Sequence, residues 1–433
     1  MALVLKFFVI EAYQIPTGSM QPTVMGDAEA GIQDRVLADK LGTLLRDPRR
    51  WEVMIFRLPY DERQLYVKRI IGLPGETLEV AGGDIWIDDR IARKPDHVNE
   101  SVLKAVFPVK DGGIEVGRWF RSSQPGSIEM AGTRAVFPPG SQAELRLAGD
   151  VLDDYLHGYD PEWHLRTAVR AEHAVSDLDV ALDVTLGSGA SALELRLLSD
   201  EGELFFSLPR EGSGGRARVA FRPEAGGPER VLLDDPARSL PVGRAVRVLA
   251  RDVDRRTILR VDGEEWVRAE DDASGRRTDR PSRAMVSLGI PGGGTIDNLV
   301  LRRDIFYTRP NGTARWEIPG DSYFALGDNT QASLDGRKWA LKTYTLKDGR
   351  SITGFWFPER YPGSGPTDAN PRLLGNGRLS FADTHGDVFE FAESDVVSQD
   401  LQPSPFIPAR NLLGKAIAVF WPVYHPFRWK LIR

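Results

Sequence analysis

Short alternating or β-branched runs, separated by turn residues, dominate the first hundred positions of the chain. Leu-Pro-Gly and Gly-Gly steps punctuate the strand-like runs, which are Val53–Phe56, Tyr66–Ile71, Thr77–Val80 and Asp84–Ile87. Alternation with a period of two indicates strands, and Gly and Pro mark the turns between them. The chain therefore begins as an all-β domain.

From about residue 100 to residue 303 the same pattern continues with longer strands. The expected strands are Leu178–Leu186, Ala192–Leu198, Leu204–Leu208, Arg216–Phe221, Val246–Val253, Thr257–Val261, Trp266–Arg268, Ala284–Leu288 and Thr295–Leu301. An Asp-Gly step at 262–263 predicts a tight hairpin. Strands at regular spacing with turn signals favour a β-sandwich. An insertion of this kind can fold as its own unit, so we expect the remaining chain to work when a short linker replaces it.

A smaller β module is expected at 341–399. Its strands surround Asp348-Gly349 and continue at Arg378–Ala382 and Asp387–Ala392, with a Pro/Gly-rich loop at 361–370. A decorated surface hairpin explains the same pattern equally well.

Two short segments carry the candidate chemistry. Residues 15–23 read IPTGSMQPT and place Ser19 in a tight turn, whereas residues 66–76 read YVKRIIGLPGE and place Lys68 among Val and Ile. Desolvation lowers the pKa of a lysine, and a neutral lysine beside a serine hydroxyl is a nucleophile with its base. The ordinary alternatives are a turn serine and a lysine on the solvent face of a strand.

Composition narrows the chemistry. The chain has no cysteine, which excludes a thiol nucleophile, disulfides and cysteine-based metal sites. Six scattered histidines have no metal-ligand spacing and favour a lysine base over a Ser-His-Asp triad. A net charge of −6 gives no reason to expect nucleic-acid binding. No metal or cofactor is expected.

The serine and lysine segments resemble the signature segments of type I signal peptidases, membrane-bound serine proteases that remove leader peptides from exported proteins. Further segments resemble the family in the same order: DRVLADK at 34–40, RWEVMIF at 50–56, GDSYFALGDN at 320–329, SLDGRKW at 333–339, PARNLLGKA at 408–416 and FWP at 420–422. Gly336 stands where the family usually has a serine. The resemblance covers roughly residues 1–95, 305–340 and 400–425.

The resemblance implies a serine–lysine mechanism. Ser19 is the expected nucleophile and Lys68 the expected general base. The backbone N–H of Ser19 and the hydroxyl of Thr17 are the expected oxyanion donors. Ser333 matches a family serine that orients the lysine.

Four further residues are expected to support the site. Asp335 and Arg337 would form an ion pair, and Asp328 and Asn329 would hold their loop. The family also implies the partners: signal peptides of exported preproteins, with small side chains one and three residues before the cut, and the lipid bilayer.

The membrane assignment depends on the ends of the chain. Residues 1–12 are apolar apart from Lys6 and Glu11. They resemble the outer end of a transmembrane helix whose remainder lies upstream. The alternative is a short first strand or a buried helix. Residues 406–433 interleave aromatic and basic residues, which suits a lipid headgroup region or, equally, a final core strand with a basic tail. The implied location is the cytoplasmic (inner) membrane, with the catalytic domain on the extracytoplasmic side.

The expected fold is all-β, with a signal-peptidase-like domain interrupted twice. The expected order is 1–12 membrane anchor, 13–99 catalytic domain, 100–303 sandwich, 304–340 catalytic domain, 341–399 small insert, and 400–433 closing strand and tail. Residues 292–301 are similar to the last strand of concanavalin-like domains, which bind sugars or serve as scaffolds. Two rivals remain: a catalytically degenerate scaffold that displays a carbohydrate- or peptide-binding sandwich, and a self-cleaving repressor-type serine–lysine protease.

Overall fold

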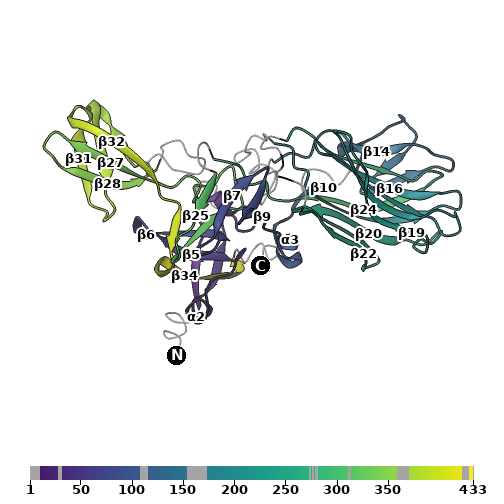
Figure 1. Ribbon diagram of the computed structural model, residues 1–433, viewed down its shortest axis with the longest axis horizontal. Helices are drawn as coiled ribbons and strands as arrows, with labels where there is room; N and C mark the ends of the chain where they lie inside the picture. Colours follow the sequence, from purple (N-terminus) through teal and green to yellow (C-terminus); the bar gives the residue numbers. More distant parts are fainter. Residues whose placement is uncertain are drawn as a thin grey trace.

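The chain forms three β-rich bodies in a row (Figure 1). The computed structural model describes residues 10–27, 32–107, 116–153, 173–272, 275, 277, 281–310, 314–357, 370–421 and 429–432. A central body lies between a large sandwich, drawn on the right, and a small module, drawn on the left. Strands form most of the described structure, which confirms the all-β expectation with a β-sandwich insertion.

The central body is assembled from distant parts of the chain. Its main sheet has the order β1 (Ile10–Gln14), β4 (Arg35–Asp39), β34 (Leu412–Trp421), β5 (Val53–Leu58), β6 (Asp61–Gly72), β26 (Ser322–Leu326) and β33 (Phe406–Pro408), and β35 (Lys430–Leu431) pairs with β34. A second sheet has the order β25 (Arg315–Glu317), β7 (Thr77–Ala81), β8 (Asp84–Ile87) and β9 (Arg90–Ile91), and β2 (Gly26–Asp27) pairs with β3 (Ile32–Gln33). The chain therefore leaves this body twice. It returns first through β25 of the second sheet, before β26 of the main sheet, and the second time through β33 of the main sheet.

Burial along β6 departs from simple alternation. Its first half is largely exposed, whereas every residue from Val67 to Gly72 is buried. Both faces of this half-strand are covered, because Val67, Ile70 and Ile71 pack into three different apolar clusters. A lysine in this half-strand has no solvent face to point to, so the solvent-facing interpretation of Lys68 is wrong.

The sandwich consists of two antiparallel sheets around one apolar core. One sheet has the order β12 (Glu129–Ala131), β13 (Arg134–Phe137), β24 (Gly294–Arg303), β15 (Leu178–Leu186), β20 (Val246–Val253), β21 (Arg256–Val261) and β22 (Glu264–Glu270), and β10 (Lys104–Phe107) pairs with β24. The other has the order β11 (Phe120–Ser122), β14 (Glu144–Leu147), β23 (Ala284–Gly289), β16 (Ala192–Ser199), β17 (Gly202–Pro209), β18 (Ala217–Pro223) and β19 (Arg230–Asp235). At the predicted Asp-Gly hairpin, Asp262 and Gly263 have φ angles of 48° and 85°, the left-handed pair that a two-residue turn requires.

The small module has two three-stranded sheets. They have the orders β28 (Ser351–Trp356), β27 (Ala340–Leu346), β32 (Val396–Pro403) and β29 (Arg372–Leu374), β30 (Arg378–Ala382), β31 (Val388–Ala392). Buried Tyr344, Phe381 and Phe391 give it a core of its own, so it is more than a surface hairpin. Most of the Pro/Gly-rich loop at 361–370 lies outside the described residues.

Helical segments are short. They are η1 (Gly18–Met20), α2 (Lys40–Leu45), α3 (Asp96–Val102), α4 (Val116–Trp119), η2 (Gly375–Gly377), η3 (Glu393–Asp395) and η4 (Ala409–Asn411). Within the described ranges, no helix is both long and apolar enough to cross a membrane. The proposed membrane anchor falls mainly on residues 1–9, outside those ranges, and β1 begins at Ile10.

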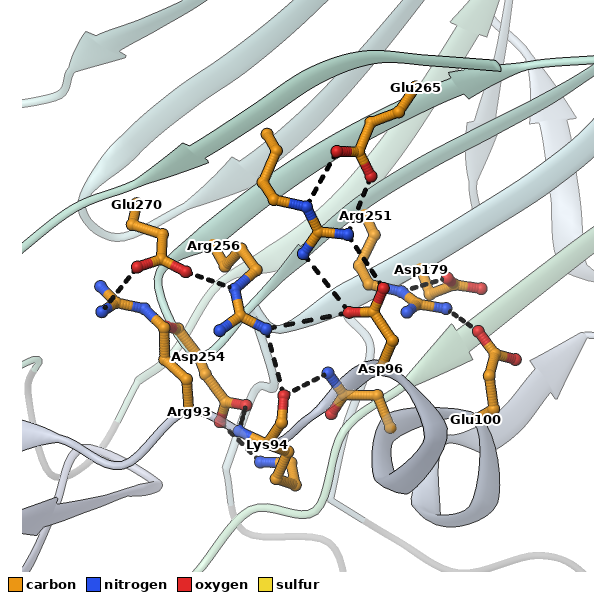
Figure 2. A network of polar contacts seen from close by, with 12 residues as sticks. Arg93, Lys94, Asp96, Glu100, Asp179, Arg251, Asp254, Arg256, Glu265 and Glu270 are labelled. Carbon is orange, nitrogen blue, oxygen red and sulfur yellow. Dashed lines mark hydrogen bonds and ion pairs between the residues drawn. The ribbon is translucent and has the colours of Figure 1, made fainter. Parts of the chain in front are cut away.

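Helix α3 joins the central body to the sandwich. Its Val98 and Val102 pack into an apolar cluster of the central body. On its polar side, Asp96 pairs with arginines of β21 and β22, and Glu100 pairs with Arg251 of β20 (Figure 2). The amphipathic spacing of one helix thus places carboxylates against a basic sheet face.

Candidate active site

Ser19 sits in the single turn η1, which its neighbours hold against the central body. Ile15, Met20 and Val24 on either side are buried in one apolar cluster. The N–H of Gln21 donates to the carbonyl of Gly18 at 3.1 Å, which closes the turn. Ser19 itself is 8% exposed. The predicted Pro/Gly turn therefore presents a nearly buried hydroxyl.

Lys68 meets this hydroxyl from strand β6. Its Nζ lies 2.5 Å from Oγ of Ser19, within hydrogen-bond distance. The lysine pairs with Met54 in β5 and is 2% exposed. Sequence reasoning proposed these two residues as nucleophile and base, and the fold brings them into contact.

The surroundings of Lys68 lower the pKa of its amine, so that a larger fraction is neutral than in an ordinary lysine. Burial lowers the pKa of Lys68 to about 8, because a cation loses its hydration there. The nearby carboxylates of Asp335 and Asp328 raise this pKa and Arg337 lowers it, but burial outweighs the carboxylates. A lysine with such a pKa is neutral in a useful fraction of molecules near neutral pH.

The loop after β26 fixes the backbone of the serine turn. The N–H of Asn329 donates to the carbonyl of Ser19 at 3.2 Å, and its side-chain Nδ2 donates to the carbonyl of Gly18 at 3.1 Å. Asn329 thus supports the serine through main-chain groups of the turn. Its expected role of holding its own loop stays a prediction.

Asp328 is anchored by a residue that sequence reasoning missed. Nε and Nη2 of Arg69 donate to its two carboxylate oxygens at 2.8 and 2.7 Å, and the hydroxyl of Thr23 donates to the same group. Burial alone would raise the pKa of Asp328, but Arg69 holds it below its usual value. In the sequence, the indication that Arg69 is buried was its position next to Lys68, in an apolar run that is covered on both faces.

Ser333 is fully buried close to the serine turn. Its Oγ has no hydrogen-bond partner among the residues that the structure describes. A β-carbon on Gly327 would overlap both this Oγ and the carbonyl oxygen of Ser19, so the three groups crowd together and only glycine fits between. The predicted contact between Ser333 and Lys68 stays a prediction.

Asp335 and Arg337 form a buried ion pair beneath the loop. Nε and Nη2 of Arg337 donate to the carboxylate at 2.9 and 2.7 Å. The carboxylate also accepts from the N–H of Gly327 at 3.0 Å, and Arg337 donates to the carbonyl of Thr330 at 2.8 Å. Burial opposes ionisation, but Arg337 keeps the pKa of Asp335 well below its usual range. The pair therefore ties both ends of the loop together.

Thr17 precedes the turn with extended backbone, at φ −122° and ψ 155°, and its side chain is exposed and forms no capping hydrogen bond. It is therefore available to a ligand. Its role as an oxyanion donor stays a prediction.

One group of carboxylates has metal-like spacing. Oxygens of Asp84, Asp177 and Asp254 lie within 4.8 Å of one another, at the joint between the central body and the sandwich. Nζ of Lys94 lies 2.5 Å from Asp254, and Arg277 pairs with Asp177. These two cations already pair with two of the three carboxylates, so the group serves as an ion-pair cluster.

The start of the chain matches a known family. Residues 1–107 match the family model described as signal peptidase, peptidase S26. Signal peptidase I of Pseudomonas fluorescens is 38% identical over 110 residues, covering 24% of this chain and 37% of that protein. Signal peptidase I of Pseudomonas aeruginosa is 43% identical over 83 residues, covering 18% of this chain and 29% of that protein. The chain thus spans about a third of the length of these relatives.

Solved structures resemble the chain only weakly. The β-glucanase of Bacillus licheniformis has a TM-score of 0.28 at 10% identity, covering 46% of this chain and 96% of that chain. Domain 4 of an extracellular arabinanase from Geobacillus stearothermophilus has a TM-score of 0.28 at 17% identity, covering 47% and 92%. The family match includes both Ser19 and Lys68. On that match and those relatives, the segment from residue 1 to residue 107 is similar to the type I signal peptidase family.

Proposed function

We propose that this protein is a serine endopeptidase of the signal peptidase I type, which cleaves N-terminal signal peptides from exported preproteins. The observation that carries the proposal is the 2.5 Å contact between Oγ of Ser19 and Nζ of a fully buried Lys68. A nucleophile within reach of a neutral base is the minimum apparatus for acyl transfer.

The reaction begins when Oγ of Ser19 attacks the scissile carbonyl carbon. Lys68 takes the hydroxyl proton as the new C–O bond forms, and the carbonyl oxygen becomes an oxyanion. The N–H of Ser19 and the hydroxyl of Thr17 are the proposed donors to this oxyanion. When the intermediate collapses, the C–N bond breaks and Lys68 returns the proton to the leaving amine.

Water completes the cycle. Neutral Lys68 takes a proton from water as the water oxygen attacks the acyl-enzyme, and it returns the proton to Oγ of Ser19 as the ester bond breaks. One peptide bond and one water are consumed, and the enzyme is regenerated. Asn329 supports this cycle by holding the backbone of the serine turn. Asp328, bound by Arg69, is proposed to hold the loop that carries Asn329.

The proposed substrates carry small side chains, typically Ala, one and three residues before the cut. The proposed location is the cytoplasmic membrane, with the active site on its extracytoplasmic side. An exposed apolar tip supports a bilayer partner: on α2, Leu44 and Leu45 are 75% and 76% exposed, and Ile10, paired with the residue that caps α2, is 40% exposed. Figure 1 places α2 at the end of the central body away from both inserted bodies.

A cleavage assay with matched variants tests the proposal. The protein is incubated with a preprotein that has Ala at both specificity positions, and the product is identified by N-terminal sequencing. Cleavage by the wild type after the second Ala, with none by Ser19→Ala, is the expected result. Equal cleavage by the two proteins would refute the serine mechanism. No cleavage by either, together with binding of a glycan or peptide to the sandwich, would favour the degenerate-scaffold alternative.

A further inference from the structure

The loop that holds the serine turn is itself held by the sandwich. Lys104 lies on β10, whose partner strand is β24, and its Nζ donates to the main-chain carbonyl of Asp328 at 2.9 Å. Lys104 is 6% exposed. Asp328 thus contacts Arg69 of the central body through its side chain and Lys104 of the sandwich through its main-chain carbonyl.

Two neighbouring residues of the loop are also held, one by the segment that returns from the sandwich and one by the insertion itself. The hydroxyl of Thr330 donates to the carbonyl of Phe306, three residues beyond the end of β24, at 2.7 Å. The side-chain amide of Gln331 donates to the carboxylate of Asp153, inside the insertion, which also contacts His173 at 2.9 Å. Residues 328–331 therefore bridge the insertion on one side and the serine turn on the other.

The joint between the bodies is built to be stiff. Arg251 of the sandwich pairs at 2.7 Å with Asp179, both being at most 1% exposed, and also binds Glu100 of α3 (Figure 2). Lys94 of the central body pairs with Asp254 of the sandwich at 2.5 Å. Moving the two bodies apart would break the Lys94–Asp254 pair and leave buried charges without their partners, which is costly. The Arg251–Asp179 pair lies within the sandwich and holds Arg251 towards Glu100 of α3. Strand β10 is therefore fixed relative to the active-site loop.

We infer that Lys104 is a positioning residue: through the carbonyl of Asp328 it holds the loop whose Asn329 fixes the backbone at Ser19, so that the sandwich is part of the support of the active site. This inference rests on the proposed function for its effect on catalysis. It also replaces the expectation that the sandwich can be exchanged for a linker, because that exchange removes Lys104 and Asp153.

The chemistry of the contact explains why a lysine stands here. A carbonyl oxygen needs only an N–H donor, and an amine donates whether or not it is charged. Burial, reinforced by Arg303, lowers the pKa of Lys104 to about 7, yet the hydrogen bond survives deprotonation. A methionine has similar length and no donor, so Lys104→Met removes the bond while filling the space.

The test compares three full-length variants by steady-state cleavage of a preprotein. For Lys104→Met we expect kcat to fall about tenfold with KM within about twofold, since one positioning hydrogen bond is lost. Lys104→Arg, which restores a donor, should keep kcat within about threefold of the wild type. Arg251→Met, the control, breaks a buried pair within the sandwich, Arg251–Asp179, without touching the loop. If it lowers kcat as much as Lys104→Met, Lys104 has no special role and the inference is wrong.

A readout independent of cleavage separates this inference from the proposed function. Hydrogen exchange reports the opening of the Asn329 amide, which donates to the carbonyl of Ser19. We expect faster exchange at residues 327–331 and 18–24 in Lys104→Met, and wild-type exchange in Lys104→Arg. This holds even if no preprotein is cleaved. Unchanged exchange in both segments would overturn the inference. If the methionine variant is insoluble, Lys104→Gln, whose shorter side chain cannot span the contact, is measured in its place with the same criteria.

Discussion

Nζ of Lys68 lies 2.5 Å from Oγ of Ser19, although 49 positions separate the two residues in the chain. The contact exists because η1 is pinned by apolar neighbours and β6 is buried on both faces where the lysine sits. The same burial that places the amine also lowers its pKa. Position and basicity therefore have one cause.

Cleavage should rise with pH through the titration of Lys68. Its pKa is about 8, so deprotonation is about a tenth complete at pH 7 and nearly complete at pH 9, and kcat/KM should rise about tenfold in between. Burial also lowers the pKa of Lys338, in the loop between β26 and β27, to about 8. Lys338→Gln is therefore the control and should keep the inflection.

The identity of the base gives a second measurement on the same residue. Lys68→Arg should be as inactive as Lys68→Met, because arginine stays protonated at any working pH. A pH profile flat between 6 and 9, or an active arginine variant, would mean that Lys68 only binds or positions.

Ser333→Ala should separate activity from stability. The hydroxyl is buried and lacks a hydrogen-bond partner within the described part of the chain, so its removal should change the free energy of unfolding by less than about 1 kcal/mol. If Ser333 orients Lys68 during catalysis, kcat should fall about tenfold or more with an unchanged fold. Wild-type kcat in a stable alanine variant would show that the hydroxyl merely fills space.

The local chemistry was readable from sequence because it depends on short segments. A turn serine and a lysine among β-branched residues are local patterns, and the alternating strands from Leu178 to Leu301 follow from their period. The strands between Phe120 and Leu147 were missed, since they are only three or four residues long. So short a run has too few residues to define a period.

The supporting charges could not be predicted in the same way. Arg69, Lys104 and Arg251 are each buried against a partner that is far away in sequence. In a sequence, an isolated basic residue in a strand is read as solvent-facing, because buried cations are rare unless paired. Only the fold reveals the pair, and with it the link between the insertion and the active-site loop.

Removing one partner of the Arg69–Asp328 pair should lower the free energy of unfolding more than replacing both partners. Asp328→Asn leaves the guanidinium of Arg69, at 0% exposure, without a counter-ion, and we expect the free energy of unfolding to fall by about 3–5 kcal/mol. Arg69→Met combined with Asp328→Asn should recover part of this loss. Chemical denaturation of the wild type and the variants measures both. Additive losses in the double variant would show that the two residues are not coupled.

Acid should weaken the same pair. The pKa of Asp328 is lower in the folded chain than in the unfolded chain. Its contribution to stability is therefore complete above the unfolded pKa of about 4 and is lost as the pH falls through the folded value. Asp328→Asn should accordingly flatten the loss of stability between pH 4 and lower pH, and an unchanged acid profile would contradict the assignment.

Membrane binding should depend on the tip of α2. Leu44 and Leu45 are 75% and 76% exposed, and burial of a leucine side chain is worth about 1.5–3 kcal/mol when complete. Leu44→Ser with Leu45→Ser should therefore weaken binding to phosphatidylglycerol-containing vesicles about tenfold or more, as measured by co-sedimentation. Leu373, 62% exposed on the small module, provides the control, because Leu373→Ser removes an exposed leucine from a body on another side of the molecule (Figure 1). Equal weakening by the control would mean that binding follows total apolar surface. Vesicle binding unchanged by the α2 double variant would remove α2 from the membrane-facing surface and leave the bilayer partner to be sought elsewhere on the chain.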